Sequence, residues 1–311
     1  MLVFKKDFTQ QEPIPEQGIE KALEVLRSGR LHRYNLLPGE KGLVCELEEK
    51  FAAYMGMKYC LACASCGSSL FLALKSVGVR PGDKVLCNAY TLAPVPGAIE
   101  HCGAQTVLVD ILDDYTIDTD DLAAKAEATG ARFLMLSHMR GHIARMDKVM
   151  EVCERYNLVL IEDCAHTMGA TWDGKKSGTF GKVGCYSTQT YKHMNSGEGG
   201  LLVTNDDEVM ARAIIHSGSY MIYGTHTSRP ALEAFEEVKW VTPNFSMRMD
   251  HLRAALLLPQ LEKLDVQCRR WNELYDHTEA LLRQIPGISC PPRDSREYYV
   301  GSSIQFNIDG A

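Results

Sequence analysis

Lys192 invites a chemical interpretation because of the groups that flank it. It lies in a loop between the strand-like segment 184–188 and a glycine-rich turn at 197–200. An unprotonated lysine amine forms a Schiff base with a carbonyl group, and partial burial or a neighbouring cation lowers the lysine pKa enough for that reaction. Because a loop lysine is more often merely solvated, this interpretation depends on the other groups.

Asp163 is the second candidate, since it ends the apolar run 158–163, which is typical of a buried strand. A buried carboxylate is costly unless it meets a cation or several hydrogen-bond donors. A protonated pyridine nitrogen is such a cation, and the carboxylate would keep it protonated. The alternative is that Asp163 caps the following helix, and both interpretations stay open at this point.

Two further segments could bind an anion. The small-residue turn 65–69, which includes Gly67 and Ser68, leads into a helix whose free N–H groups attract negative charge. Ser187, which precedes Lys192 by five positions, could donate its hydroxyl to the same anion. Each has an ordinary alternative, as a helix cap or as a strand-end serine bonded to nearby backbone.

The fold must position these groups, and the distribution of apolar residues between residues 43 and 215 indicates which fold it is. Short apolar runs alternate with helical segments, which is typical of a mostly parallel sheet covered on both faces. We therefore predict an α/β fold with ligands at the carboxyl ends of the strands. The expected strands are 59–63, 84–87, 106–110, 133–137, 158–163, 184–188 and 200–204, and the expected helices are 43–54, 70–77, 120–127, 146–156 and 206–217.

Near Leu232 the pattern changes to two long helical stretches, 249–264 and 269–284, followed by a strand-like end at 298–308. We predict a large cofactor-binding domain with an N-terminal arm over residues 1–248. Residues 249–311 are expected to form the start of a smaller α+β domain.

Composition narrows the classes of function. The net charge is −7 with both signs interspersed, and no basic stripe suited to nucleic acid or an anionic membrane is present. The longest apolar runs are too short to span a bilayer, and the N-terminal residues 1–7 lack the features of a signal peptide. Eleven cysteines, an odd number, fit free thiols and a cytoplasmic location.

One cysteine cluster has an alternative interpretation. The spacing of Cys60, Cys63 and Cys66 resembles part of an iron–sulfur run, although a fourth cysteine is missing. Buried cysteines in a strand lined with small residues are the favoured interpretation, so we expect no metal.

Several short motifs follow one another in a specific order and spacing. They are EDCAHTMGA at 162–170, GTFG at 178–181, GCYS at 184–187, Lys192, GEGG at 197–200 and VTND at 203–206. With these motifs the sequence resembles the DegT/DnrJ/EryC1/StrS aminotransferases from about residue 16 to the end. The resemblance implies a fold-type I pyridoxal 5'-phosphate enzyme with a large, mostly parallel mixed sheet sandwiched by helices. It also implies transfer of an amino group, expected from glutamate, to a keto-sugar carried on a nucleotide.

The resemblance assigns a role to each candidate. Lys192 matches the lysine that forms the internal aldimine and then shuttles the proton, and Asp163 matches the partner of the pyridinium nitrogen. His166 falls beside the cofactor ring and its phenolic oxygen. Sugar 3-dehydratases of this family carry histidine at the lysine position, so a lysine favours amino transfer. The expected phosphate ligands are Gly67, Ser68 and Ser187.

The sequence departs from the family at two places in the expected site. Leu92 stands where an aromatic residue usually stacks on the cofactor ring; leucine can pack there but cannot stack, and Tyr90 is the alternative. Ser246 stands where an asparagine usually reaches the phosphate of the neighbouring subunit's cofactor, and Asn244 is the alternative. The resemblance thus implies a homodimer with shared active sites.

Two other expectations follow from the same comparison. Arg30, Arg33 and Tyr34 lie where the family's N-terminal segment borders the substrate pocket. The family also usually continues well past the last residue of this chain, which implies that the small domain, residues 249–311, is incomplete. Together with the two departures, this motivates an alternative function, in which a degenerate member binds the cofactor without turnover and acts as a regulatory or partner-binding protein.

Overall fold

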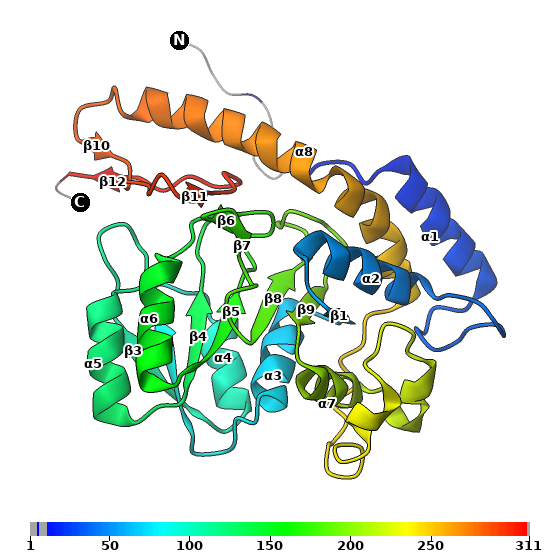
Figure 1. The fold of residues 1–311 in the computed structure, drawn as a ribbon. Helices are drawn as coiled ribbons and strands as arrows, with labels where there is room; N and C mark the ends of the chain where they lie inside the picture. The colour runs from blue at the N-terminus through cyan, green and yellow to red at the C-terminus, as the bar shows by residue number, and fades with distance from the viewer. Residues whose placement is uncertain (1–4, 6–10, 310–311) are drawn as a thin grey trace.

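A seven-stranded sheet forms the centre of the molecule in the computed structural model, which describes residue 5 and residues 11–309 (Figure 1). Four strand pairs are parallel and only β9 runs antiparallel to its neighbours, so the predicted mostly parallel sheet is confirmed. In spatial order the strands are β1 (Tyr59–Cys63), β9 (Gly200–Thr204), β8 (Val183–Ser187), β5 (Val159–Asp163), β4 (Phe133–Ser137), β2 (Lys84–Asn88) and β3 (Gln105–Val109).

Helices cover both faces of this sheet because most of its strands are apolar on both sides. One face packs against α2 (Leu43–Met55), α5 (Thr119–Thr129), α6 (Met146–Tyr156) and α8 (His251–Leu282). The other face packs against α3 (Cys66–Ser76), α4 (Pro94–His101) and α7 (Asp207–Ser217). The α/β architecture predicted from the alternating pattern is therefore confirmed.

The C-terminal part differs from its predicted elements. Instead of two helices, residues 251–282 form the single helix α8, which continues through Pro259. Instead of one strand over 298–308, the structure has two short ones, β11 (Glu297–Tyr298) and β12 (Asn307–Ile308). They pair with β6 (Thr171–Trp172) and β10 (Ile288–Ser289), and β7 (Lys175–Lys176) completes the small sheet of β6. The division between residues 248 and 249 stays a prediction.

Other helical elements were not predicted. They are α4, α1 (Glu16–Ser28), which packs on α8, and the 3₁₀ segments η1 (Tyr220–Thr225) and η2 (Leu232–Phe235). No helix of the described residues has the length and apolar character needed to cross a membrane. The N-terminal residues 1–7, judged above for a signal peptide, lie outside the described part of the chain apart from Lys5.

The N-terminal region is tied to the body by a buried ionic cluster. Both Arg33 guanidinium Nη atoms lie 2.9 Å from the Glu48 carboxylate, and neither side chain is exposed. Glu48 also accepts from the Ala62 N–H at 2.8 Å and lies 3.1 Å from His226 Nε2. Arg33 is therefore a structural ion-pair partner, which corrects the expectation that it borders the substrate pocket. Replacing either Arg33 or Glu48 would leave the other charge buried without its partner, which would strongly lower the stability of the folded protein.

Candidate active site

Asp163 ends β5 at the carboxyl edge of the sheet, with its side chain buried. One carboxylate oxygen accepts from the Ser137 hydroxyl at 2.8 Å and the other from the Ala165 N–H at 3.1 Å. Burial raises the pKa of this carboxyl, and these donors and Lys192 offset only part of the effect. The carboxylate thus lies in a place where a further cation would stabilise it.

Register explains why Ser137 meets Asp163. The last residues of β4 and β5 are paired, so Ser137 and Asp163 lie side by side at one sheet edge. Asn88, at the end of β2, accepts from the Ser137 N–H at 2.9 Å and donates to the Ser137 carbonyl at 3.1 Å. Neither residue was predicted, although each is polar and follows an apolar run, as Asp163 does.

His166 lies just beyond β5 and is 8% exposed. Its Nδ1 accepts a hydrogen bond from the Arg140 backbone N–H at 3.0 Å. Burial, with Lys192, Arg140 and His193 as further contributors, lowers the pKa of His166 to about 3. The ring is therefore neutral near pH 7, and with Nδ1 acting as acceptor its proton sits on Nε2.

Lys192 lies in a loop that α8 holds in place. Gln260 of α8 accepts from the Asn195 N–H and donates to the Asn195 carbonyl, both at 2.8 Å. Burial lowers the pKa of the Lys192 amine, although Asp163 acts in the opposite direction. Among the described residues the amine has no hydrogen-bond or ion-pair partner. Lys192 is thus a half-buried amine close to Asp163, with a pKa shifted toward the nucleophilic form.

The predicted anion-binding segments meet across β9. Gly200 of β9 pairs with Ser187 of β8 on one side and with Cys63 of β1 on the other. The chain after Cys63 turns at Ser65, whose side chain caps α3 by accepting from the Ser68 N–H at 3.0 Å. Within the described part of the chain the Gly67 N–H has no acceptor, as expected at the start of a helix.

Gly200 is needed for this close approach, because a Cβ there would lie 2.3 Å from the Ser65 carbonyl oxygen and 2.5 Å from Ser69 Oγ. We expect Gly200→Ala to lower the free energy of unfolding by about 1–3 kcal/mol, since backbone must shift to make room. The measurement is urea denaturation. The matched control is Gly97→Ala, at an exposed position of α4 with nothing within 4 Å of a Cβ, where the change should stay within about 1 kcal/mol. Equal stability of the two variants would contradict this account.

Leu92 and Tyr90 lie in the loop after β2. Leu92 is 42% exposed, and the Tyr90 ring is half-buried against Tyr115, with ring centroids 5.2 Å apart. Neither makes a polar contact to Asp163 or Lys192 within the described residues. Which of the two would pack on a bound ring stays a prediction.

Asn244 and Ser246 lie beyond the β1 edge, and both side chains are exposed. Their segment is held by pairing of Met247 with Ala64 and with Ser217. Asn244 Oδ1 accepts from the Ser246 N–H at 2.8 Å, and Ser246 has a positive φ of 57°. Within the described residues of one subunit, neither residue contacts the other predicted site residues.

The cysteine cluster does not gather at one point. Cys60 and Cys63 project from opposite faces of β1 into separate cores, and burial raises the pKa of all three thiols of the cluster. The described residues offer two other groups of metal-ligand type, around Glu48 and Glu162. Glu48 is ion-paired, and Glu162 already accepts from the N–H groups of Gly178, Phe180 and Gly181. Both carboxylates therefore have structural partners.

Taken together, the geometry fits pyridoxal 5'-phosphate. The buried Asp163 carboxylate could take a pyridinium nitrogen, the unpartnered Lys192 amine an aldehyde, and the α3 N-terminus with Ser68 and Ser187 a phosphate. These complementary groups come from the ends of three strands, β1, β5 and β8, at the sheet edge where α/β proteins bind ligands.

Known proteins match this chain over most of its length. The sequence pattern of the DegT/DnrJ/EryC1/StrS aminotransferase family matches residues 14–309. GDP-perosamine synthase of Caulobacter vibrioides is 36% identical over 225 residues, which cover 71% of this chain and 57% of that protein. L-glutamine:2-deoxy-scyllo-inosose aminotransferase of Streptoalloteichus tenebrarius is 35% identical over 294 residues, which cover 93% of this chain and 69% of that protein.

Solved structures agree with the sequence matches. The crystal structure of 3-amino-5-hydroxybenzoic acid synthase superposes with a TM-score of 0.84 at 28% identity, covering 98% of this chain and 76% of that one. The chain spans 57% and 69% of the length of the two relatives named above.

Proposed function

Since the chain belongs to the DegT/DnrJ/EryC1/StrS aminotransferase family, we propose that it moves an amino group from glutamate to a keto-sugar, using pyridoxal 5'-phosphate held on Lys192. One observation carries the proposal. The half-buried Lys192 amine, without a partner among the described residues, lies close to a buried Asp163 carboxylate whose pKa burial raises. Binding of the cofactor aldehyde requires a lysine with a lowered pKa. Binding of its protonated ring nitrogen requires a buried carboxylate whose charge is not already neutralised by other groups.

Each residue then has a defined task. The bound cofactor supplies an electron sink for the carbon from which a proton leaves. Asp163 keeps the ring nitrogen protonated, and Ser137 and Ala165 orient its carboxylate. Lys192 would hold the cofactor covalently and, once released, would carry the proton between the substrate carbon and the cofactor. His166 presents its Nε2–H beside the ring. The phosphate is expected at the Gly67 N–H and the hydroxyls of Ser68 and Ser187.

The substrate class is proposed from the relatives. Their names include a GDP-perosamine synthase and an L-glutamine:2-deoxy-scyllo-inosose aminotransferase. We infer a nucleotide-linked keto-sugar as acceptor, and we keep glutamine beside glutamate in the test of the donor. The eleven cysteines found as free thiols support the proposed cytoplasmic location.

The deciding experiment is a transaminase assay with glutamate and glutamine against nucleotide-linked and free keto-sugars. Turnover of a nucleotide-linked keto-sugar supports the proposal. Cofactor uptake with no turnover of any acceptor would instead favour the regulatory alternative.

We also propose a homodimer with shared active sites. Asn244 and Ser246 are exposed, and within the described residues of one subunit they contact none of the other predicted site residues. We therefore propose that they bind the phosphate of the partner subunit's cofactor. Sedimentation should give twice the monomer mass of 34.7 kDa. A monomer that retains full activity would contradict this proposal.

A further inference from the structure

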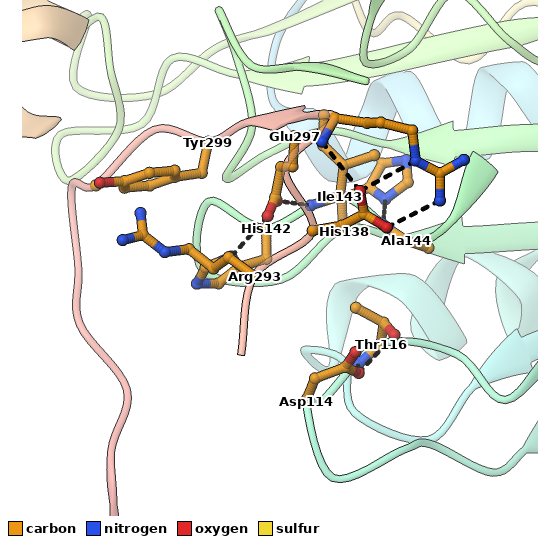
Figure 2. Close-up of polar contacts among 12 residues, drawn as sticks. Asp114, Thr116, His138, His142, Ile143, Ala144, Arg293, Glu297 and Tyr299 are labelled. Atoms are coloured by element: carbon orange, nitrogen blue, oxygen red, sulfur yellow. Dashed lines mark hydrogen bonds and ion pairs between the residues drawn. The ribbon is translucent and has the colours of Figure 1, made fainter. Parts of the chain in front are cut away.

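The C-terminal segment Glu297–Ser302 lies against the loop that connects β4 to α6, as Figure 2 shows around Glu297. The Glu297 carboxylate is only 4% exposed. One of its oxygens accepts from the Ile143 N–H at 2.6 Å, and the other lies 3.4 Å from His142 Nδ1. A buried carboxylate with these two contacts restrains the loop backbone.

A second contact joins the same two segments at Gly141. The Val300 N–H donates to the Gly141 carbonyl at 3.2 Å. A Cβ at Gly141 would lie 2.0 Å from the Val300 oxygen, and the φ of Gly141 is 94°, so only glycine permits the approach. The loop is thus clamped on both sides of position 142.

The clamped loop carries the hydrogen bond that orients His166. Arg140, directly before Gly141, has a left-handed φ of 59° and points its N–H at His166 Nδ1. A left-handed conformation is unfavourable for arginine, and it persists only where surrounding contacts impose it. The turn that contains Arg140 is closed by the His142 N–H, which donates to the Met139 carbonyl at 3.2 Å, and the contacts of Glu297 and Val300 adjoin this turn.

The C-terminal segment is itself held by contacts to α8 and to Arg293, so it can act as a clamp. Asn272 of α8 donates to the Tyr299 carbonyl at 2.8 Å and accepts from the Gly301 N–H at 2.7 Å. The Arg293 guanidinium lies 3.8 Å from the centre of the Tyr299 ring (Figure 2). The segment continues to Ser302, whose hydroxyl lies 3.4 Å from Nε2 of His193, the neighbour of Lys192.

We infer that Glu297 is a positioning residue for the proposed cofactor site: by clamping the loop at Ile143 and His142, it holds the Arg140 N–H against His166 Nδ1 and so keeps the His166 proton on Nε2. The inference rests on the proposed function for its consequence, because the Nε2–H then serves the phenolic oxygen of the cofactor. The polar contacts of the Glu297 side chain are to Ile143 and His142 and not to Asp163, Lys192 or His166 among the described residues, so its proposed effect on the site goes through the loop.

The test reads the tautomer directly. Long-range ¹H–¹⁵N spectra of the full chain labelled at its ten histidines distinguish Nε2–H from Nδ1–H, and His166→Gln assigns the signal. In cofactor-free wild type we expect one Nε2–H form of His166. In Glu297→Ala we expect a mixture of tautomers and a Kd for pyridoxal 5'-phosphate about five- to tenfold higher, the effect of one hydrogen bond.

Two further variants make the outcome decisive. Glu297→Gln keeps an oxygen for the Ile143 N–H, so its His166 spectrum should match wild type and its Kd stay within about twofold of the wild-type value. Glu273→Ala, at an exposed glutamate of α8, is the matched control and should change neither. If Glu297→Ala fails to fold, Glu297→Asp replaces it, because the shorter side chain keeps the charge but loses its reach to Ile143.

An unchanged tautomer in the alanine or aspartate variant overturns the inference, even if stability falls, because a merely structural role would lower stability alone. The proposed function fails by a different result, namely a wild type that takes up no pyridoxal 5'-phosphate. The cofactor-free spectra would still decide the role of Glu297 in that case.

Discussion

Lys192→Ala is expected to abolish covalent capture of pyridoxal 5'-phosphate and to lower kcat by about 10²–10⁴-fold or more, since the variant loses both the nucleophile and the group that moves the proton. The fold should persist because the Lys192 amine has no partner among the described residues and the loop is held by Gln260. Borohydride reduction followed by peptide mass analysis makes the measurement. A trapped adduct in the variant would show that another lysine is used.

The control for this prediction is Lys148→Ala, at an exposed lysine of α6, which should leave capture unchanged. The wild type should also show a pH dependence. Because burial lowers the pKa of Lys192, the reactive unprotonated amine appears at a lower pH than at an ordinary lysine. The rate of cofactor capture should therefore rise with pH through an apparent pKa below 10.5, and a midpoint above that value would contradict the assigned burial effect.

Asp163→Asn is expected to separate activity from stability. The variant keeps the size of the side chain and an oxygen for the Ser137 hydroxyl, but it loses the charge that holds the ring nitrogen protonated. We expect kcat to fall by about 10²–10⁴-fold. Spectra of the loaded variant should report an unprotonated ring nitrogen, and an activity within a few fold of wild type would remove Asp163 from its proposed role.

In the cofactor-free protein the same change should raise the melting temperature at neutral pH. The folded-state pKa of Asp163 is raised above its usual value by burial, so the ionised form disfavours the folded state. The contribution of Asp163 to stability is therefore fully present below the pKa it has in the unfolded chain, where the carboxyl is protonated. It is lost as pH rises through the higher pKa of the folded state. Asparagine removes that penalty, and the advantage should vanish at acid pH. The control is Asp113→Asn, at an exposed aspartate, which should shift neither property.

Lys192 and Asp163 are candidates in the sequence because each has a local signal and because the order of the surrounding segments matches the family. Asp163 ends an apolar run, and Lys192 lies between a strand and a glycine-rich turn. The same local signals predict four elements with the bounds that the structure has, namely β1, β4, β9 and α6. A continuous apolar run or a 3.6-residue period depends only on neighbouring residues, which explains this agreement.

Other elements were missed where local signals conflict with tertiary packing. Pro94, Pro96 and Gly97 are typical of a loop, yet they begin α4, where proline at the first helical positions fits well. Similarly, the sequence predicts two helices where the structure has the single helix α8. No local pattern shows that the two halves continue as one helix in the packed protein.

The types and order of the residues in the sequence single out Lys192 and Asp163 as candidates, whereas the tertiary structure decides which groups they meet. Ser137 meets Asp163 only because β4 and β5 pair in that register, and β9 joins Ser187 to the start of α3 only because it runs antiparallel between β8 and β1. Glu297 reaches the loop that orients His166 across more than a hundred residues of sequence. Such contacts depend on how distant segments pack, and no periodicity within a short window encodes that packing.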